Sequence, residues 1–197
     1  AWANTPEATR LFRHLEDVNQ FKQEFLDRFA IYMGDFLNYE TAWNEIWEPM
    51  YDMIKSEYQY HGRLFGFSLS RYNAELKKAQ NWFNLRKDKM YSMLSAYYKI
   101  GEPCPLTIND SYTESESERM SIFINVIKLS NSKFNGRFFA NREVILEGYN
   151  VIGWKVSLVK NNGEKSVQEY SGDTFVFSMP NCKSLSISAI YGTTAID

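Results

Sequence analysis

A histidine and a glutamate four residues apart come nearest to a chemical pattern in this chain. His14 and His61 are the only histidines, and Glu57 precedes His61 by one helical turn. On a helix this spacing brings the two side chains together on one face. A metal site needs further ligands, and the sequence offers none at a usable spacing. We therefore interpret Glu57 and His61 as a solvent-exposed ion pair, with a metal site as the alternative.

A cluster of carboxylates lies shortly before that pair. Glu45, Glu48 and Asp52 recur at three- and four-residue spacing, and two neighbouring carboxylates can act as general acid and base. The same spacing is typical of the solvated face of a surface helix, which is the interpretation we favour. No catalytic residue and no metal ligand is predicted.

Two glycines resemble part of a phosphate-binding loop. Gly148 and Gly153 have the four-residue gap of such a loop, but Trp154 follows the second glycine and Lys155 comes one position late. A kinase-like Asp-Phe-Gly motif is also missing, because Leu37 follows Asp35 and Phe36. We expect no cofactor-binding residue in this chain.

Aromatic side chains remain as candidates for ligand binding, because sugar-binding modules stack rings on exposed tyrosine and tryptophan. Trp154 alternates with apolar residues and is predicted to fill a core. Tyr149, Tyr170 and Tyr191 lie near turns or strand ends and are the candidate ligand-binding residues, with ordinary packing as the alternative. Three further tryptophans exceed what one helical stripe can hide and indicate a covering partner: Trp43, Trp47 and Trp82.

Composition limits the partners. The 197 residues are 44% apolar, and 24 acidic side chains stand against 22 basic ones, so no basic face for nucleic acid is predicted. No apolar run approaches the roughly 20 residues of a membrane helix. Cys104 and Cys182 are expected as two free, partly buried thiols, with a disulfide between them as the alternative. Because the chain starts at Ala1 without a methionine, we expect a piece of a longer protein.

The period of the apolar residues places these candidates on two kinds of element. Spacings of three and four predict three to four helices up to Tyr98. The first starts at Thr5, Pro6 and Glu7 and is either one helix or two helices broken near Asn19. The second begins near Asn38, and Pro49 predicts a kink or a helix restart near Glu48. A loop from His61 to Leu69 follows, then a helix capped by Ser70 that ends at Gly101 and Pro103. The stripe of the first helix is Leu11, Leu15, Val18, Phe21, Phe25, Phe29 and Tyr32 or Met33.

From Ile122 onward the apolar residues alternate, which predicts strands. About seven short strands indicate an antiparallel, Ig-like β-sandwich. One alternating strand contains Ile152, Trp154, Val156 and Leu158, and Asn162 with Gly163 predicts a type I′ hairpin turn. The fold class is thus α+β in two parts: a helical segment (1–105), an acidic linker or loop (106–119) and the sandwich (120–197).

The helical segment resembles the C-terminal end of the CotH (spore coat protein H) kinase-like family, as found in surface proteins of gut Bacteroidetes. The likeness covers about residues 2–105 and rests on spaced aromatic residues and arginines rather than on a catalytic signature. The residues that carry it are Leu11, Phe12, Arg13, Phe21, Lys22, Phe25, Leu26, Asp27, Arg28, Phe29, Ile46, Ile54, Glu57, His61, Trp82, Arg86, Met90 and Leu94. The tail resembles the Ig-like modules appended to such proteins, around Gly136, Gly153 and Trp154.

The resemblance implies a parent protein that is exported to the cell surface and has an atypical protein-kinase fold binding ATP and Mg²⁺. The family's nucleotide-binding and catalytic acids lie upstream of the matched helices, so none is carried over to this chain. We expect a non-catalytic C-terminal fragment that acts as scaffold or interaction module. Its expected partners are the upstream part of the same protein and a surface glycan or protein. The alternatives are a piece that completes a phosphotransferase and a glycan-binding module.

Overall fold

Four α-helices and two β-sheets make up the described part of the chain. This is a computed structural model, and it describes residues 5, 7, 9–35, 41–66, 68–109, 121–129 and 133–192. The helical elements are α1 (Arg10–Glu16), α2 (Asn19–Asp35), the π-helical turn η2 (Thr41–Trp47), α3 (Glu48–Phe65) and α4 (Leu69–Tyr98). The α+β class, with a helical part and a β-sandwich, is therefore confirmed.

Nine strands form the two sheets of the sandwich. They are β1 (Pro103–Asn109), β2 (Ile122–Ile124), β3 (Ile127–Lys128), β4 (Phe134–Phe139), β5 (Glu143–Gly148), β6 (Val151–Val159), β7 (Lys165–Ser171), β8 (Thr174–Ser178) and β9 (Ser184–Tyr191). One sheet has the order β4-β1-β9-β6-β7 and the other β3-β2-β5-β8. All pairings are antiparallel except that between β1 and β9.

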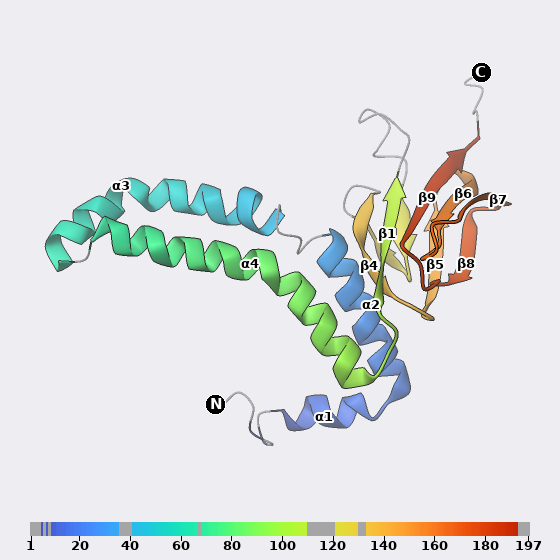
Figure 1. Ribbon diagram of the computed structural model, residues 1–197, viewed down its shortest axis with the longest axis horizontal. Helices are drawn as coiled ribbons and strands as arrows, with labels where there is room; N and C mark the ends of the chain where they lie inside the picture. Colours follow the sequence, from blue (N-terminus) through green and yellow to red (C-terminus); the bar gives the residue numbers. More distant parts are fainter. Residues whose placement is uncertain are drawn as a thin grey trace.

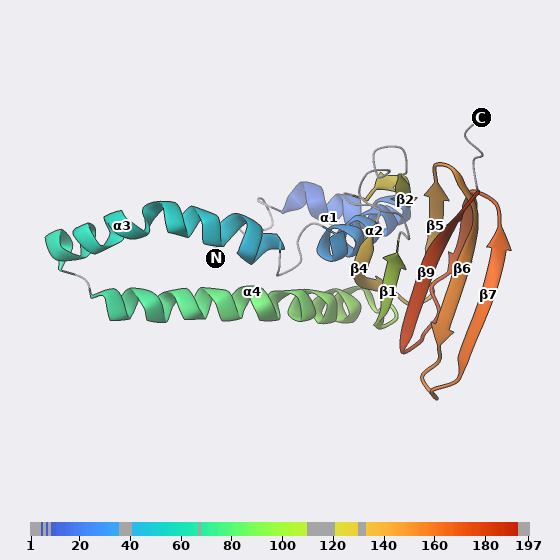
Figure 2. The ribbon, with the colours of Figure 1, turned by 90° about the horizontal axis from the view of Figure 1, so that it is seen from above.

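The molecule has a body and an arm (Figure 1). The body is the sandwich together with α2, which lies against β4. The arm is made of α3 and the first part of α4, which run side by side and antiparallel away from the sheets (Figure 2). The last turns of α4 return to α2, and only residues 99–102 separate α4 from β1. The arm is therefore joined to the sandwich through one continuous helix.

One hydrophobic core joins the helical and the strand-built parts. Trp154 lies fully buried between the sheets, as its alternation predicts. The same cluster includes Ala30 and Ile31 of α2. A second, smaller cluster contains Leu26 and Tyr91 from the helices and Phe139 from β4. Both α2 and the end of α4 thus share buried surface with the sheets.

Two glycines allow α2 to lie directly on β4. A Cβ atom added to Gly136 would come within 2.7 Å of the Cα of Gly34, and one added to Gly34 would come within 2.9 Å of the Cα of Gly136. Real Cβ atoms do not approach other heavy atoms so closely. The backbones therefore meet at this point because neither residue has a side chain.

The helix boundaries confirm some predictions and correct others. Of the two alternatives for the first helix, the structure has two helices, with α2 beginning at Asn19. Beside Pro49 the π-helical η2 ends at Trp47 and α3 begins at Glu48, with Trp47 itself in the right-handed helical conformation. The loop predicted from His61 to Leu69 is wrong, because α3 continues to Phe65 and Gly66 ends it in the left-handed conformation. Ser68, not Ser70, caps α4 by accepting a hydrogen bond from the Arg71 amide.

The ends of the helical part also differ from the prediction. The first helix begins at Arg10 rather than at Thr5. The last one ends at Tyr98, before the Gly101 that was expected to mark its end, and Lys99 takes the left-handed cap conformation. In the first stripe Leu11 and Val18 are exposed, whereas Met33 is buried as predicted. The buried face of α2 also includes three residues outside the predicted stripe, Leu26, Ala30 and Ile31.

The strands show three corrections. Ile152 is exposed, because a β-bulge between Val151 and Gly153 turns it outward and buries Val151 in its place. The Asn162-Gly163 hairpin exists, but only Gly163 has a positive φ, so the turn is not of type I′. The alternating segment that begins at Ile122 does not continue as one strand to Leu129, because β2 and β3 pair as a hairpin.

The expected acidic linker at 106–119 is partly wrong. Residues 106–109 belong to β1, an interior strand of the five-stranded sheet, and residues 110–119 lie outside the described residues. The same holds for Pro6, Phe36, Leu37 and the helix start near Asn38. The division of the chain into separate domains stays a prediction.

Candidate functional site

The arm is held together by aromatic side chains between its two helices. Tyr72 of α4 lies between Tyr51 and Tyr58 of α3, with ring centroids 5.7 and 3.6 Å apart. Nearer the body, the Trp43 ring of η2 stacks on Trp47 at 4.5 Å and meets Phe83 of α4 edge-on at 6.0 Å. Tyr51 and Tyr58 therefore mark the inner face of α3, which is turned toward α4. The opposite face of α3 takes no part in these contacts.

That opposite face carries apolar side chains in a regular pattern. We call Met50, Met53, Glu57, Tyr60 and Leu64 the outer stripe. Their spacings alternate between three and four residues, which is the pattern of a coiled-coil seam. Met53 is two residues beyond Tyr51, so it lies about 200° around the helix from the ring that faces α4. Its side chain is 74% exposed.

The outer stripe has no cover within the described part of the chain. None of the residues of α3 is buried, and Leu64 is 59% exposed. The neighbouring helix adds a second apolar surface, where Trp82 is half exposed and the Arg86 guanidinium lies 5.0 Å from its ring centroid. An amphipathic helix normally buries one such stripe, and here each helix of the arm leaves apolar side chains in solvent.

The base of the arm is fixed to the body by buried contacts of α4. The Tyr91 hydroxyl donates a hydrogen bond to the Arg137 carbonyl oxygen of β4 at 2.8 Å and lies 3.4 Å from the Ala30 carbonyl oxygen of α2. Burial raises the pKa of this phenol. One side chain thus ties α4, α2 and the sheet together, and the direction of the arm is set at this point.

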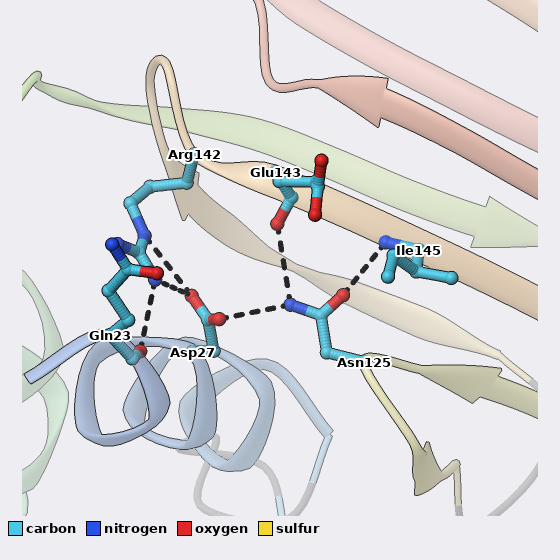
Figure 3. A network of polar contacts seen from close by, with 6 residues as sticks. All are labelled: Gln23, Asp27, Asn125, Arg142, Glu143 and Ile145. Atoms are coloured by element: carbon cyan, nitrogen blue, oxygen red, sulfur yellow. Dashed lines mark hydrogen bonds and ion pairs between the residues drawn. The ribbon is translucent and has the colours of Figure 1, made fainter. Parts of the chain in front are cut away.

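A polar network attaches α2 to the four-stranded sheet, through Asn125 after β2 and Arg142 before β5 (Figure 3). Arg142 donates to the Asp27 carboxylate from Nη2 at 2.7 Å and from Nε at 3.2 Å, and to the Gln23 carbonyl oxygen at 3.0 Å. The Asn125 side-chain amide donates to the other Asp27 oxygen at 3.1 Å. Both oxygens of the carboxylate therefore have partners on the strand-built side.

Asn125 positions this network because it also completes the sheet. Its side-chain oxygen accepts a hydrogen bond from the Ile145 backbone amide at 2.8 Å, and the backbone amide of Asn125 donates to the Ile145 carbonyl oxygen at 2.9 Å. Asn125 and Val126 form the β2–β3 turn with φ values of 45° and 64°. Asparagine tolerates this conformation, whereas a β-branched valine is strained by it.

The network lines a cleft of about 530 Å³, whose other walls include Val126, Asn141 and Glu143. Burial raises the pKa of Asp27, and the hydrogen bond and charge of Arg142 act in the opposite direction. The carboxylate is engaged by two partners and no nucleophile stands beside it. The arrangement is suited to docking a helix on a sheet rather than to acid–base chemistry.

A second cleft, of about 460 Å³, lies between α1, α2 and the end of α4. Glu16 accepts hydrogen bonds there from the Tyr98 hydroxyl at 2.5 Å and the Tyr97 hydroxyl at 3.2 Å. Burial, followed by the hydrogen bond to Glu16, raises the pKa of Tyr98. The three side chains hold α1 on the end of α4.

The three tyrosines predicted as ligand-binding residues occupy different settings. Tyr149 stands in the β5–β6 turn and is 63% exposed. Tyr170 lies on β7, where its ring packs on Phe175 at 4.5 Å. Tyr191 ends β9 opposite Val151 and is half-buried. Glycan binding at these residues stays a prediction, with Tyr149 the most accessible of the three.

The other predicted candidates lie on the arm or in the sheets. His61 is exposed on α3 and its ring faces Phe65 at 5.5 Å. Asp52 pairs with Lys55 on the same helix, which fits the solvated face predicted for these carboxylates. Among the residues that the structure describes, no group of His, Cys, Asp or Glu could hold a metal ion. Gly148 ends β5 and Gly153 lies within β6, so they do not form a loop.

Comparisons with protein families, with curated proteins and with solved structures find no match to this chain. None of the described helices is long and apolar enough to cross a membrane.

The sequence did not predict the polar network of Asp27, Asn125 and Arg142 that joins α2 to the sandwich. Asp27 is one of the residues of the family resemblance, and it shares a helix face with Ala30, Ile31 and Gly34, at spacings of three, four and seven residues. A carboxylate on a buried face of a helix predicts a cationic or amide partner. That signal indicates a partner for Asp27, but it does not say which of the 22 basic residues provides it.

Proposed function

We propose that this chain is a non-catalytic interaction module whose arm packs against the upstream, kinase-like part of the same protein. The observation that carries this proposal is the outer stripe, a coiled-coil pattern on a helix without a single buried residue. The choice of occupant rests on the resemblance of the helical segment to the end of a CotH kinase-like lobe. In such a protein, the helices at the end of the lobe have the rest of the lobe to pack against.

The outer stripe specifies the chemistry of its partner. Met50, Met53, Tyr60 and Leu64 require an apolar groove or helix face. Glu57 stands in the middle of the stripe, and a carboxylate buried there needs a hydrogen-bonding or cationic group opposite it. The partner surface is therefore apolar with one basic or amide side chain near its centre.

The sandwich is the base of this module, and we propose that it is Ig-like, exported and located at the cell surface. Its support is the pair of packed sheets around a buried Trp154 together with the resemblance of the tail to appended surface modules. Any phosphotransferase activity, with its ATP and Mg²⁺, belongs in this proposal to the upstream part. Export is tested by the protease accessibility of the protein on intact cells.

The test of the docking proposal compares one substitution in two contexts. In the chain by itself, Met53→Asp places a charge on an exposed position and changes the unfolding temperature little. In the full-length protein the same position is covered. There we expect the substitution to lower the free energy of unfolding by about 2–5 kcal/mol, the range for a buried apolar side chain that is removed or replaced by an unpaired charge. Thermal unfolding and hydrogen exchange of α3 measure the two effects.

Gln59→Asp is the matched control, because it adds the same charge to the same helix away from the outer stripe. It is expected to be neutral in both contexts. If Met53→Asp is as harmless in the full-length protein as it is in the isolated chain, then the outer stripe is not covered by the upstream part and the proposal is wrong.

A further inference from the structure

The two cysteines of the chain lie next to each other although 77 residues separate them in the sequence. Cys104 is the second residue of β1, and Cys182 lies in the loop between β8 and β9. Because β1 and β9 pair in parallel, with Leu106 opposite Leu185, the start of β1 is brought beside the residues that precede β9. Both side chains are buried, with exposures of 3% and 5%.

Both thiols belong to the same buried cluster. Burial raises the pKa of the Cys182 thiol to about 11, and hydrogen bonding and charge repulsion from Cys104 act in the same direction. The Cys104 sulfur also lies 3.9 Å from the side-chain oxygen of Asn181, the residue before Cys182. Asn181 is in turn held by the Asn161 side-chain amide at 3.2 Å. The loop is thus fixed with Cys182 against Cys104.

We propose that Cys104 and Cys182 form a redox-sensitive pair, which closes to an intramolecular disulfide by exchange with an oxidising disulfide such as glutathione disulfide. One protein thiolate attacks the oxidant and forms a mixed disulfide, and one glutathione thiol leaves. The second protein thiolate then attacks the protein sulfur of the mixed disulfide and releases the second glutathione thiol. Two electrons pass to the oxidant, and the two protons end on the released thiols.

The bond would act at the base of the arm. Cys104 follows α4 by six residues and lies on the strand that continues it, whereas Cys182 belongs to the far end of the sandwich sequence. Oxidation would therefore fasten the root of the arm covalently to the loop before β9. Such a ring of almost eighty residues restricts the unfolded chain strongly. This inference does not depend on the proposed docking function.

The experiment treats the reduced 197-residue chain with an excess of glutathione disulfide and then alkylates it after denaturation. We expect the intact mass to fall by two hydrogen atoms, no cysteine to be alkylated, and a peptide linking Cys104 to Cys182 to be recovered. The unfolding temperature should rise by roughly 9–18 °C and return on reduction, the range that chain entropy gives for a chain of this size.

Cys104→Ser and Cys182→Ser are the matched controls. Each leaves one thiol, so neither can lose two hydrogen atoms, and the unfolding temperature of each should not rise with the oxidant. The proposal is overturned if both cysteines of the unsubstituted chain remain alkylatable, if they carry glutathione instead, or if they link two chains. The peptide map of the unsubstituted chain decides the matter even where a serine variant does not fold.

Discussion

Replacing Arg142 by methionine tests whether the polar network fixes α2 to the sandwich. Methionine keeps the length of the side chain and removes the charge, so three donated hydrogen bonds are lost, two to Asp27 and one to Gln23. The side chains of Arg142 and Asp27 are 15% and 17% exposed. Removal of one partner from a fully buried pair costs about 3–5 kcal/mol, and partial solvation of Asp27 reduces this. We expect a loss of about 2–3 kcal/mol in the free energy of unfolding at pH 7.

The pH dependence of the variant gives the prediction a second readout. Burial already raises the pKa of Asp27 above its ordinary value of 3.8, with Arg142 opposing the shift. Without Arg142 the pKa rises further. A carboxyl whose pKa is higher in the folded than in the unfolded state binds its proton more tightly when folded. Stability is then lost as the pH rises from about 4 through the folded-state pKa. Arg142→Met should therefore lose more stability over this window than the unsubstituted chain.

Urea unfolding at pH 4 and pH 7 measures both effects, and Arg137→Met is the matched control. Arg137 also pairs with an aspartate, Asp88, at 2.8 Å, but these side chains are 39% and 63% exposed. An exposed ion pair contributes at most about 1 kcal/mol. If Arg142→Met costs no more than the control and shows the same pH profile, then the network does not stabilise the junction and our reasoning about it is wrong.

Two backbone positions give the remaining predictions. Gly136→Ala places a Cβ atom 2.7 Å from the Cα of Gly34, so α2 must move away from β4. We expect the free energy of unfolding measured in urea to fall by about 1–3 kcal/mol. An unchanged midpoint would contradict the close approach of the two backbones. Val126→Asn relieves a β-branched residue held at a φ of 64° with a 77% exposed side chain. It should raise the free energy of unfolding by about 1 kcal/mol, and a fall in the unfolding temperature would speak against strain at this turn.

The fold class could be predicted because the two periodicities are strong local signals. Trp154 is buried as its alternation with apolar residues predicts, and a new helical element begins at Glu48 beside Pro49. The strand β1 escaped prediction because Pro105 cannot donate a hydrogen bond to a neighbouring strand, and proline usually argues against an interior strand. Pro105 nevertheless lies opposite Arg137 in the ladder. Local preference was overridden there by pairing partners that lie far away in the sequence.

The candidate site was only partly predictable for a related reason. The amphipathic pattern of α3 is visible in the sequence, but its outer stripe was not separated from the inner aromatic face. That separation requires knowing that Tyr72 lies against Tyr51 and Tyr58. The pairing of Asp27 with Arg142 spans 115 residues and follows from the sheet topology, which the sequence does not specify. The bulge at Ile152 likewise has no local sequence signal that we can name.

The unbroken length of α4 makes the arm a mechanical lever. Leu69 at the tip and Tyr91, which clamps the root before the chain enters β1, are 22 residues apart, or about 33 Å measured along the helix. A tilt of one degree at the clamp displaces the tip by at most about 0.6 Å over that length. Small rearrangements around Tyr91 would thus be amplified into ångström-scale movements of whatever the tip carries, and a pull on the tip would exert torque on the first strand of the sandwich.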